Sequence, residues 1–349
     1  MMKKNGRSKA TVKDIAKHAG VSTATVSRVL NGTNNVSPKT VAHVQASINE
    51  LGYVLDTAAK ALSSSGSKTG NIGIITPVIN NSFLSTLLEG VNQYAITCNY
   101  NLLTFALQGQ ASIRNGVPLP LNESNVDGLL VFADKIDDRT LSHLHRHQFP
   151  VVLLYRSPPP GIDFPSVLIE NKKGTYKLIE HLIKECGHRR IAFLAGPDGN
   201  HDSNWREQGY REALIDYGIP FNPELVGFGA FHDWKAKKQI EKWLTEGLEF
   251  DAIFAGDDTA AMAAIDTLQN SGRRVPDDIA VVGFNNDILA KYFTPPLTTV
   301  HVPTQEIGHT AVKQLFHLIN DEPIDKLTPF ETQLVIRQSC GCLLNKHHD

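Results

Sequence analysis

Apolar residues recur at helical spacing near the start of the chain, stop at a glycine and then start again. The break is Ala19-Gly20-Val21, and the apolar residues on its two sides are Val12, Ile15, Ala16, Val26, Val29 and Leu30. Thr11 and Asp14 have the spacing of a capping box, and Ser22 stands where the second helix would begin. Two short helices joined by a glycine-containing turn are typical of a helix-turn-helix. The periodicity alone fits a helical hairpin of a larger bundle equally well.

A third helix is predicted from Ser37 to Leu51. Ser37 can cap it, Pro38 suits its first position, Gly52 follows its end, and its apolar stripe consists of Val41, Val44, Ile48 and Leu51. This stripe is expected to pack on Ile15, Val26 and Val29. We therefore predict a three-helix DNA-binding domain over residues 1–54, with short polar side chains and one arginine on the outer face of its second helix.

Residues 55–70 are expected to form a short helix and a linker. Residues 56–62 favour a helix that is too short to be stable alone in water, and residues 63–70 are rich in serine and glycine. The short helix could fold only when bound, or the segment could be a simple tether.

From residue 71 onward the pattern changes to short apolar runs separated by helical stretches. Buried parallel strands are predicted at residues 72–75, 102–105, 128–132 and 151–154. Residues 190–197 resemble 71–77, 250–257 resemble 126–134, and 278–285 resemble 149–156, at offsets of 119, 124 and 130 residues. Three matched motifs in the same order predict two copies of one α/β unit, each a doubly wound sheet. Ligands of such sheets bind beyond the carboxyl ends of the strands, so a cleft between the two copies is expected.

The charge of the chain is unevenly distributed. Residues 1–68 contain ten Lys or Arg and three acidic residues, whereas the remainder contains 24 basic and 33 acidic residues. A basic segment at residues 1–68, followed by an acidic remainder, favours a polyanionic partner for residues 1–68 alone. A solvated basic terminus would show the same charge. The chain has neither an apolar run long enough for a membrane span nor a secretory signal, so a cytoplasmic protein without a membrane partner is expected.

The four cysteines are Cys98, Cys186, Cys340 and Cys342. They are expected to be free thiols in a reducing compartment. The pair Cys340 and Cys342 is interpreted as too closely spaced and too isolated for a zinc site, which needs four ligands. No metal and no cofactor is predicted.

Specific motifs along nearly the whole chain resemble the LacI/GalR family of bacterial transcription regulators. They are VKDIAKHAGVSTATVSRVLNG, VSPKT, ELGY, GHRRIAFLAGP, the run from Arg206 to Leu214, RVPDDIAVVGF and TPPLTTV. The resemblance implies a homodimer on a roughly palindromic operator and a periplasmic-binding-protein-like core over residues 71–349. It places an N-subdomain at about 71–170 and 301–328, and a C-subdomain at about 171–300 and 329–349.

The resemblance also assigns DNA-contacting residues. It implies that Thr23, Ala24 and Arg28 contact bases, and the chemistry agrees, because arginine paired with guanine is the commonest specific contact. The positions implied to hold the phosphate backbone are Thr11, Ser22, Thr25, Ser27 and Asn31. Leu62 matches a leucine that wedges into the minor groove in the family.

For the effector cleft, the resemblance implies a set of residues from both subdomains. They are Asn81, Phe83, Tyr155, Asp202, Arg206, Phe231, Asp257 and Asn285. Arg206 could make paired hydrogen bonds to sugar hydroxyls or a carboxylate, or could be a structural bridge to Asp202 or Asp258. Phe231 could stack on the effector or belong to the core.

The cleft departs from the family pattern at three positions. The family usually has Asn-Asp where this chain has Asp257-Asp258, and Asp where it has Asn285, so a carboxylate and an amide have exchanged places. Many relatives have Asp where this chain has Tyr155. Residues 108–122 contain glycines and prolines where relatives have a charged helix, so a shortened helix is expected there.

These observations predict a repressor that an effector controls by binding its two states differently. We favour release from DNA by a sugar; a purine or phosphorylated corepressor that promotes DNA binding is the alternative. A transport-type solute-binding protein would require a secretion signal and no basic head. An enzyme is disfavoured because the Walker A, GxSxG and HExxH motifs are all missing from the sequence.

His143, His145 and His147 are expected on a solvated helix surface. The tail at 343–349 lacks heptads, which favours a dimer over a tetramer.

Overall fold

The computed structural model describes residues 10–30, 36–53, 68–79, 81–107, 119–132, 136–326 and 328–342. The chain divides into two compact units, Met1–Ser67 and Lys68–Asp349. Each unit is described by itself below, as the head and the core.

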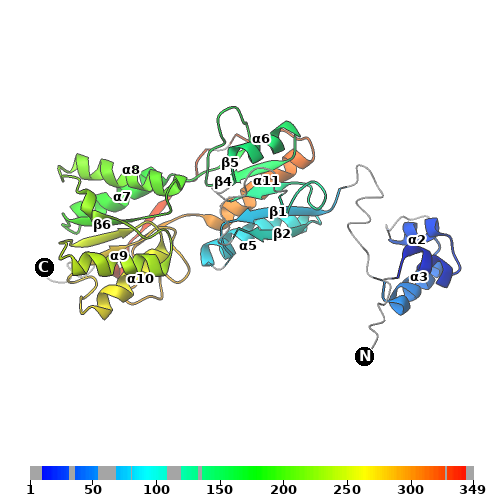
Figure 1. Ribbon diagram of the computed structural model, residues 1–349, viewed down its shortest axis with the longest axis horizontal. Helices are drawn as coiled ribbons and strands as arrows, with labels where there is room; N and C mark the ends of the chain where they lie inside the picture. The colour runs from blue at the N-terminus through cyan, green and yellow to red at the C-terminus, as the bar shows by residue number, and fades with distance from the viewer. Residues whose placement is uncertain are drawn as a thin grey trace, which may run out of the picture. The chain divides into compact units, whose positions relative to one another are not determined.

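The head contains the three predicted helices, α1 (Val12–His18), α2 (Thr23–Leu30) and α3 (Pro38–Leu51) (Figure 1). The predicted capping box of α1 is present: the Asp14 amide donates to Thr11 Oγ1, and the Thr11 amide donates to Asp14 Oδ2. Ser37 caps α3, and Gly52 ends it at a left-handed φ of 58°. Ile15, Val26 and Val44 are fully buried, which confirms the predicted packing of α3 on the first two helices.

The first sheet of the core is parallel, in the order β2-β1-β3-β4-β5. Its strands are β1 (Asn71–Thr76), β2 (Asn101–Ala106), β3 (Leu129–Val131), β4 (Val151–Leu154) and β5 (Ser166–Val167). Helices α5 (Ser82–Thr97) and α11 (Thr304–Ile319) cover one face, and α6 (Asp138–Arg146) covers the other. We call this sheet with its three helices the N-lobe.

The second sheet of the core is also parallel, in the order β7-β6-β8-β9. Its strands are β6 (Ile191–Ala195), β7 (Val226–Phe228), β8 (Ala252–Ala255) and β9 (Ala280–Val282). Helices α7 (Asn171–Lys184) and α8 (His201–Asp216) lie on one side, and α9 (Asp233–Thr245) and α10 (Asp258–Asn270) on the other (Figure 1). A 3₁₀ turn, η1 (Pro223–Leu225), precedes β7. We call this sheet with its four helices the C-lobe.

The alternation of side chains along the central strands explains the layers. In β6, Ile191 and Phe193 belong to the cluster that includes α7 and α8, whereas Ala192 and Leu194 belong to the cluster that includes α9 and α10. Successive strand residues point to opposite faces, and both faces are covered, so all five residues of β6 are buried. The predicted apolar runs therefore mark the central strands β1, β3 and β4 correctly. The predicted burial of the strand at residues 102–105 is wrong, because β2 lies at the edge of the sheet and none of its residues is buried.

The predicted internal repeat is confirmed. Strands β1, β3 and β4 of the N-lobe correspond in order to β6, β8 and β9 of the C-lobe, and in each sheet they are adjacent in this order. The flanking strands β2 and β7 occupy equivalent edges.

The chain passes between the lobes more than once. Strands β10 (Thr299–His301) and β11 (Gln333–Val335) pair antiparallel, and α11 lies between them in sequence. The chain therefore leaves the C-lobe, adds α11 to the N-lobe and returns. It ends the described core with a 3₁₀ turn, η2 (Gln338–Cys340), where Ser339 Oγ accepts from the Thr298 amide at 2.8 Å.

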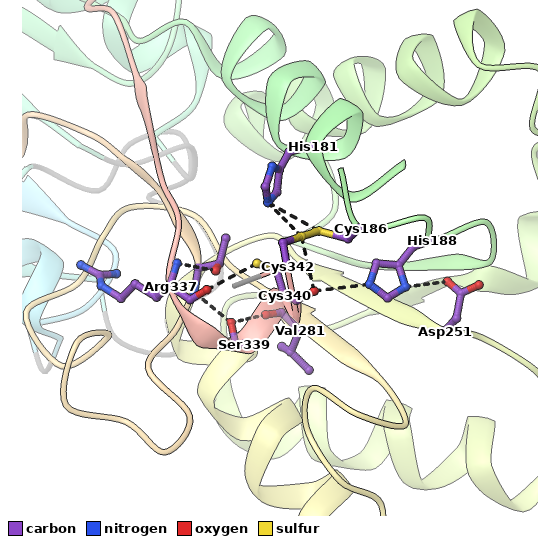
Figure 2. Close-up of a disulfide and its surroundings, with 10 residues drawn as sticks. His181, Cys186, His188, Asp251, Val281, Arg337, Ser339, Cys340 and Cys342 are labelled. Carbon is purple, nitrogen blue, oxygen red and sulfur yellow. Dashed lines mark hydrogen bonds and ion pairs between the residues drawn. A yellow bond between two sulfur atoms is a disulfide. The ribbon is translucent and has the colours of Figure 1, made fainter. Parts of the chain in front are cut away.

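The prediction of free thiols is wrong for two of the four cysteines. Cys186 and Cys342, which lie 156 residues apart in sequence, form a disulfide, whereas Cys98 and Cys340 are free. The interpretation of Cys340 and Cys342 as isolated is also wrong. The fold brings η2 against the end of α7, and this contact could not be inferred from the spacing of the cysteines (Figure 2).

The predicted solvated surface of α6 is confirmed by the exposure of His143 and His147, whose rings lie 4.1 Å apart. His145 contacts Asp163 instead. The expected shortened helix at 108–122 lies mostly outside the described residues. Its last four residues form no helix, and Leu119 and Leu121 are buried against the N-lobe.

Candidate functional site

The outer face of α2 is the first candidate site. Thr23, Ala24, Ser27 and Arg28 are exposed on it, as predicted, while Val26 faces the core and is fully buried. Ser22 Oγ accepts from the Thr25 amide at 3.1 Å, so the helix is capped at its start. This face can approach a groove closely because its side chains, apart from Arg28, are short.

Two further predicted residues lie beside this face. Thr11 is exposed at the start of α1, where Asp14 holds its side chain. The Thr25 hydroxyl lies 2.9 Å from the Ser22 hydroxyl. The remaining predicted DNA contacts, Asn31 and Leu62, lie outside the described residues.

The second candidate site lies in the core, where aromatic residues of the N-lobe follow the ends of its strands. The Phe83 ring lies 5.4 Å from Tyr155 and 6.0 Å from Phe132, and Tyr155 lies 5.0 Å from Phe132. Tyr155 is buried, with a left-handed φ of 60°, directly after β4. Burial raises the pKa of Tyr155 well above its ordinary value, and the nearby charge of Asp202 acts in the same direction. The three rings form an apolar wall, which we call the aromatic wall.

Asn81 occupies a structural position at the start of α5. Its side-chain oxygen accepts from the Leu84 amide at 2.8 Å, which makes it the N-cap of the helix. Because its oxygen already accepts a hydrogen bond from the helix, its amide NH₂ is the group that can donate to a ligand.

Arg206 is the centre of the C-lobe part of this site. It is 3% exposed on α8, and its Nε donates to Asn171 Oδ1 at 2.8 Å. Its Nη1 donates to the Gly256 carbonyl, and its Nη2 lies 3.9 Å from Asp202 Oδ2. Asp202 in turn accepts from Asn171 Nδ2 at 2.7 Å. The structural bridge from Arg206 to Asp202, the less favoured alternative to ligand binding, is present within a wider network that fixes the guanidinium.

Aromatic rings and acidic groups enclose this guanidinium. Its Cζ lies 3.9 Å from the centre of the Phe284 ring and 5.7 Å from that of Phe231. Burial lowers the pKa of Arg206, while the charges of Asp202, Asp257 and Asp258 act in the opposite direction. Phe231 is half-buried at a left-handed φ of 57° and lies close to Gly196, where a side chain would collide with its ring.

Two buried carboxyl groups follow β8. Asp257 caps α10 by accepting from the Ala260 amide at 2.9 Å, and burial raises its pKa to about 6. Asp258 accepts from the Asp287 amide and from Thr299 Oγ1, both at 2.6 Å, and burial raises its pKa to about 7. Asp258 therefore ties the C-lobe to β10.

Asn285 follows β9 at a φ of 118°. Its amide donates to the Val300 carbonyl at 2.8 Å, whereas its side-chain oxygen is buried without a hydrogen-bond partner in the described part of the chain. A buried acceptor without a partner costs free energy, and this oxygen can accept a hydrogen bond from a ligand hydroxyl.

Four of the eight predicted cleft residues line two hollows. Tyr155 and Asp202 line one of about 720 Å³, and Phe83 and Asn285 line one of about 310 Å³. Beside the second hollow, Ser82 of the N-lobe donates to Asp287 of the C-lobe. Asn81, Arg206, Phe231 and Asp257 line neither of these two hollows, and contacts to Asn171 and Asp202 connect Arg206 to the first.

The sequence prediction missed three residues of this site. Asn171 orients both Arg206 and Asp202, and Phe284 lies under the guanidinium. Trp205 is 47% exposed and lines the larger hollow. Only Phe284 had a signal in the sequence, as the aromatic residue at the end of a predicted strand.

Two family descriptions match parts of the chain. Residues 11–56 match the bacterial regulatory proteins of the lacI family, and residues 179–340 match a periplasmic binding protein-like domain. Within the part of the chain that the structure describes, helices of the length and apolar character needed to cross a membrane are absent.

Similar proteins cover nearly the whole chain. The transcriptional repressor PurR of Aliivibrio fischeri is 34% identical over 335 residues, which is 95% of this chain and 98% of that protein. The transcriptional regulator RegA of Clostridium saccharobutylicum is 32% identical over 94% of this chain and 98% of its own length. Among solved structures, a complex of the regulator CelR with cellobiose is 31% identical with a TM-score of 0.67, covering 95% of this chain and all of that one. A Lac repressor dimer bound to operator and the anti-inducer ONPF is 26% identical with a TM-score of 0.75, covering 95% and 99%.

Proposed function

The chain belongs to the LacI family of bacterial regulatory proteins, and from this premise we propose that it is a cytoplasmic, operator-binding transcriptional repressor, not an enzyme, that a small effector controls. The exposed face of α2 is the observation that carries the proposal. It offers Thr23, Ala24 and Arg28 to base edges. We assign the phosphate contacts to Thr11, Ser22, Thr25, Ser27 and Asn31, as the family resemblance implies. Leu62 serves as the minor-groove wedge.

In this proposal, residues 1–54 form the DNA-binding domain, 55–70 the hinge and 71–349 the effector core. The N-subdomain comprises about 71–170 and 301–328, and the C-subdomain about 171–300 and 329–349. The protein acts as a homodimer on a near-palindromic site, in keeping with the Lac repressor dimer on operator that it resembles. A tetramer mass from light scattering at micromolar concentration would contradict the dimer.

The test of DNA recognition is Arg28→Ala, on an operator selected from random duplex DNA. We expect a loss of about 1–3 kcal/mol of discrimination at one base pair in each half-site, because Arg28 contacts a base edge. Lys13→Ala is the matched control, since it removes an equal charge from an exposed position of α1. If Arg28→Ala weakens all sequences equally, Arg28 contacts only phosphate.

We propose a neutral sugar as the effector and release from DNA as its effect. The aromatic wall suits the apolar face of a sugar ring, and Asp257, Asn285 and the Asn81 amide supply partners for hydroxyl groups. CelR, which resembles the chain over 95% of its length, was solved with cellobiose. The effector couples to DNA by binding the two states of the core differently.

A purine corepressor is the second candidate, because PurR repressors are 34% identical over 95% of the chain. The aromatic wall would then stack on the base, and ligand binding would strengthen operator binding instead of weakening it. The substitution of Tyr155 and Asn285 for the carboxylates common in the family is compatible with either ligand.

A thermal-shift screen against sugars, sugar phosphates and purines distinguishes a sugar effector from a purine corepressor. A ligand at 100 times its dissociation constant should add about 2.7 kcal/mol of stability. A neutral sugar that stabilises the protein and lowers its operator affinity supports the first proposal. A purine that stabilises it and raises operator affinity replaces the first proposal with the second.

A further inference from the structure

Four potential metal ligands from two distant segments of the chain meet at the end of α7. They are His181, Cys186, Cys340 and Cys342, and their donor atoms all lie within 4.8 Å of one another. His181 lies on the last turn of α7, Cys186 follows that helix, and the other two cysteines come from η2 and the residues after it. Figure 2 shows the His181 ring directed at the sulfur atoms.

Two of the separations between the donor atoms match a tetrahedral site. His181 Nε2 lies 3.5 Å from Cys186 Sγ and 3.4 Å from Cys342 Sγ. In a tetrahedral zinc site with Zn–S of about 2.3 Å and Zn–N of about 2.0–2.1 Å, a histidine nitrogen and a cysteine sulfur are about 3.6 Å apart. His181 therefore needs little movement to bind a cation at the centre. Cys186 Sγ and Cys342 Sγ, which are bonded to each other in the disulfide, must separate to about 3.8 Å after reduction.

The surroundings hold the ligands in place. His181, Cys340 and Cys342 are buried, and Cys186 is half-buried. Gly341 has a left-handed φ of 81°, which lets the chain turn within one residue so that Cys340 and Cys342 reach the same centre. His188 Nε2 lies 3.5 Å from the Cys340 carbonyl, and the opposite ring nitrogen of His188 lies 3.5 Å from Asp251 Oδ1.

We propose that these four residues form a Cys₃His site for zinc when the cysteines are reduced. The disulfide between Cys186 and Cys342 accounts for two of the four groups and gives no reason for the convergence of Cys340 and His181. A thiolate-rich set with one histidine is the donor set of structural zinc. The metal would fasten the carboxyl-terminal segment after β11 to α7.

The zinc site and the disulfide are alternative states of the same residues. A dithiol reductant transfers two electrons and two protons to the disulfide, becomes a disulfide itself, and leaves Cys186 and Cys342 as thiols. Zn²⁺ then displaces one proton from each of three thiols and binds the neutral His181 ring, which gives a site of net charge −1. Disulfide formation would remove two ligands and release the metal.

The test measures the metal content of the reduced full-length protein. After reduction, incubation with zinc and removal of excess metal, we expect about one zinc ion per chain. Cys340→Ser should lose this zinc, although it retains both cysteines of the disulfide. Cys98→Ser is the matched control, because it removes the other free thiol and should retain the zinc.

A second measurement does not depend on how well a variant folds. The reduced unaltered protein loaded with Co²⁺ should show the intense visible bands of tetrahedral cobalt and thiolate charge transfer, and oxidation to the disulfide should abolish them. Substoichiometric zinc in the reduced protein, an octahedral cobalt spectrum, or full zinc retention by Cys340→Ser would overturn the proposal.

Discussion

The N-lobe and C-lobe share one topology but bring different chemistry to the site between them. The N-lobe contributes the aromatic wall of Phe83, Phe132 and Tyr155. The C-lobe contributes a buried arginine with Asp202 and Asp257 at equivalent strand ends. The repeat therefore conserves the positions at which side chains can meet a ligand and leaves the side chains themselves free to differ.

The free energy of burying these side chains also differs between the two lobes. Aromatic rings gain stability from burial, whereas buried ionisable groups lose hydration and depend on one another for compensation. The C-lobe surface should therefore be the part of the site most sensitive to substitution and to pH.

The largest effect is expected for Arg206→Ala. Its removal leaves the buried Asp257 and the half-buried Asp202 without the compensating charge, so we expect a loss of about 3–5 kcal/mol in unfolding free energy. At temperatures where the variant is folded, operator affinity without effector should be unchanged and the response to effector lost. Chemical denaturation and operator titration measure the two effects. A variant that still responds normally would show that the cleft is assigned wrongly.

Equivalent glycines in the two lobes provide the next comparison. A Cβ on Gly90 would lie 2.0 Å from the Gln305 carbonyl of α11, and one on Gly209 would lie 2.3 Å from the Lys172 carbonyl of α7. Because backbone must move in both cases, Gly90→Ala and Gly209→Ala should each cost about 1–3 kcal/mol. Gly229→Ala is the control, since its nearest atom is 3.4 Å away. Denaturation curves that show a cost in one lobe alone would mean that the two helix pairs are not equivalent.

The effect of pH should follow from the C-lobe carboxyl groups. The pKa of Asp257 is raised from 3.8 to about 6, so the folded state binds its proton more tightly than the unfolded state. The stability from this group is present below pH 4 and is lost as the pH rises through about 6. The unaltered protein should lose unfolding free energy between pH 4 and 8 because of Asp257. In Asp257→Asn this loss should be smaller by at most about 3 kcal/mol. Asp266→Asn, which removes a carboxyl group from an exposed position of the same helix, is the matched control.

The smallest effect is expected in the aromatic wall. The Tyr155 hydroxyl is buried without a hydrogen-bond partner among the described residues, so Tyr155→Phe should raise the unfolding free energy by up to about 1 kcal/mol. Thermal denaturation without ligand measures this. A clear loss of stability instead would show that the hydroxyl has a partner, such as ordered water.

The local elements could be predicted because their signals are local. The capping box at Thr11, the glycine at Gly52 and the continuous apolar strands depend on residues a few positions apart. The two-copy core was also predictable, because its motifs repeat at nearly constant spacing.

The partners within the site could not be predicted from the same patterns. Asn171 and Arg206 meet because α7 and α8 pack together, and Cys340 meets His181 because the chain returns to the C-lobe after α11. Such contacts depend on the order in which strands and helices assemble. The resemblance to a family supplied the cleft residues, but it did not reveal that the side-chain oxygen of Asn81 is engaged in capping.

The placement of α11 has a consequence for synthesis on the ribosome. All five strands of the N-lobe sheet end by Val167, but the helix that covers part of one face begins at Thr304. At about 5–20 residues per second, the intervening segment takes on the order of ten seconds to emerge. During that interval Leu130, Val152 and Leu154 are not yet covered by α11. We therefore expect the nascent N-lobe to expose apolar surface of the kind that chaperones bind until α11 has been made.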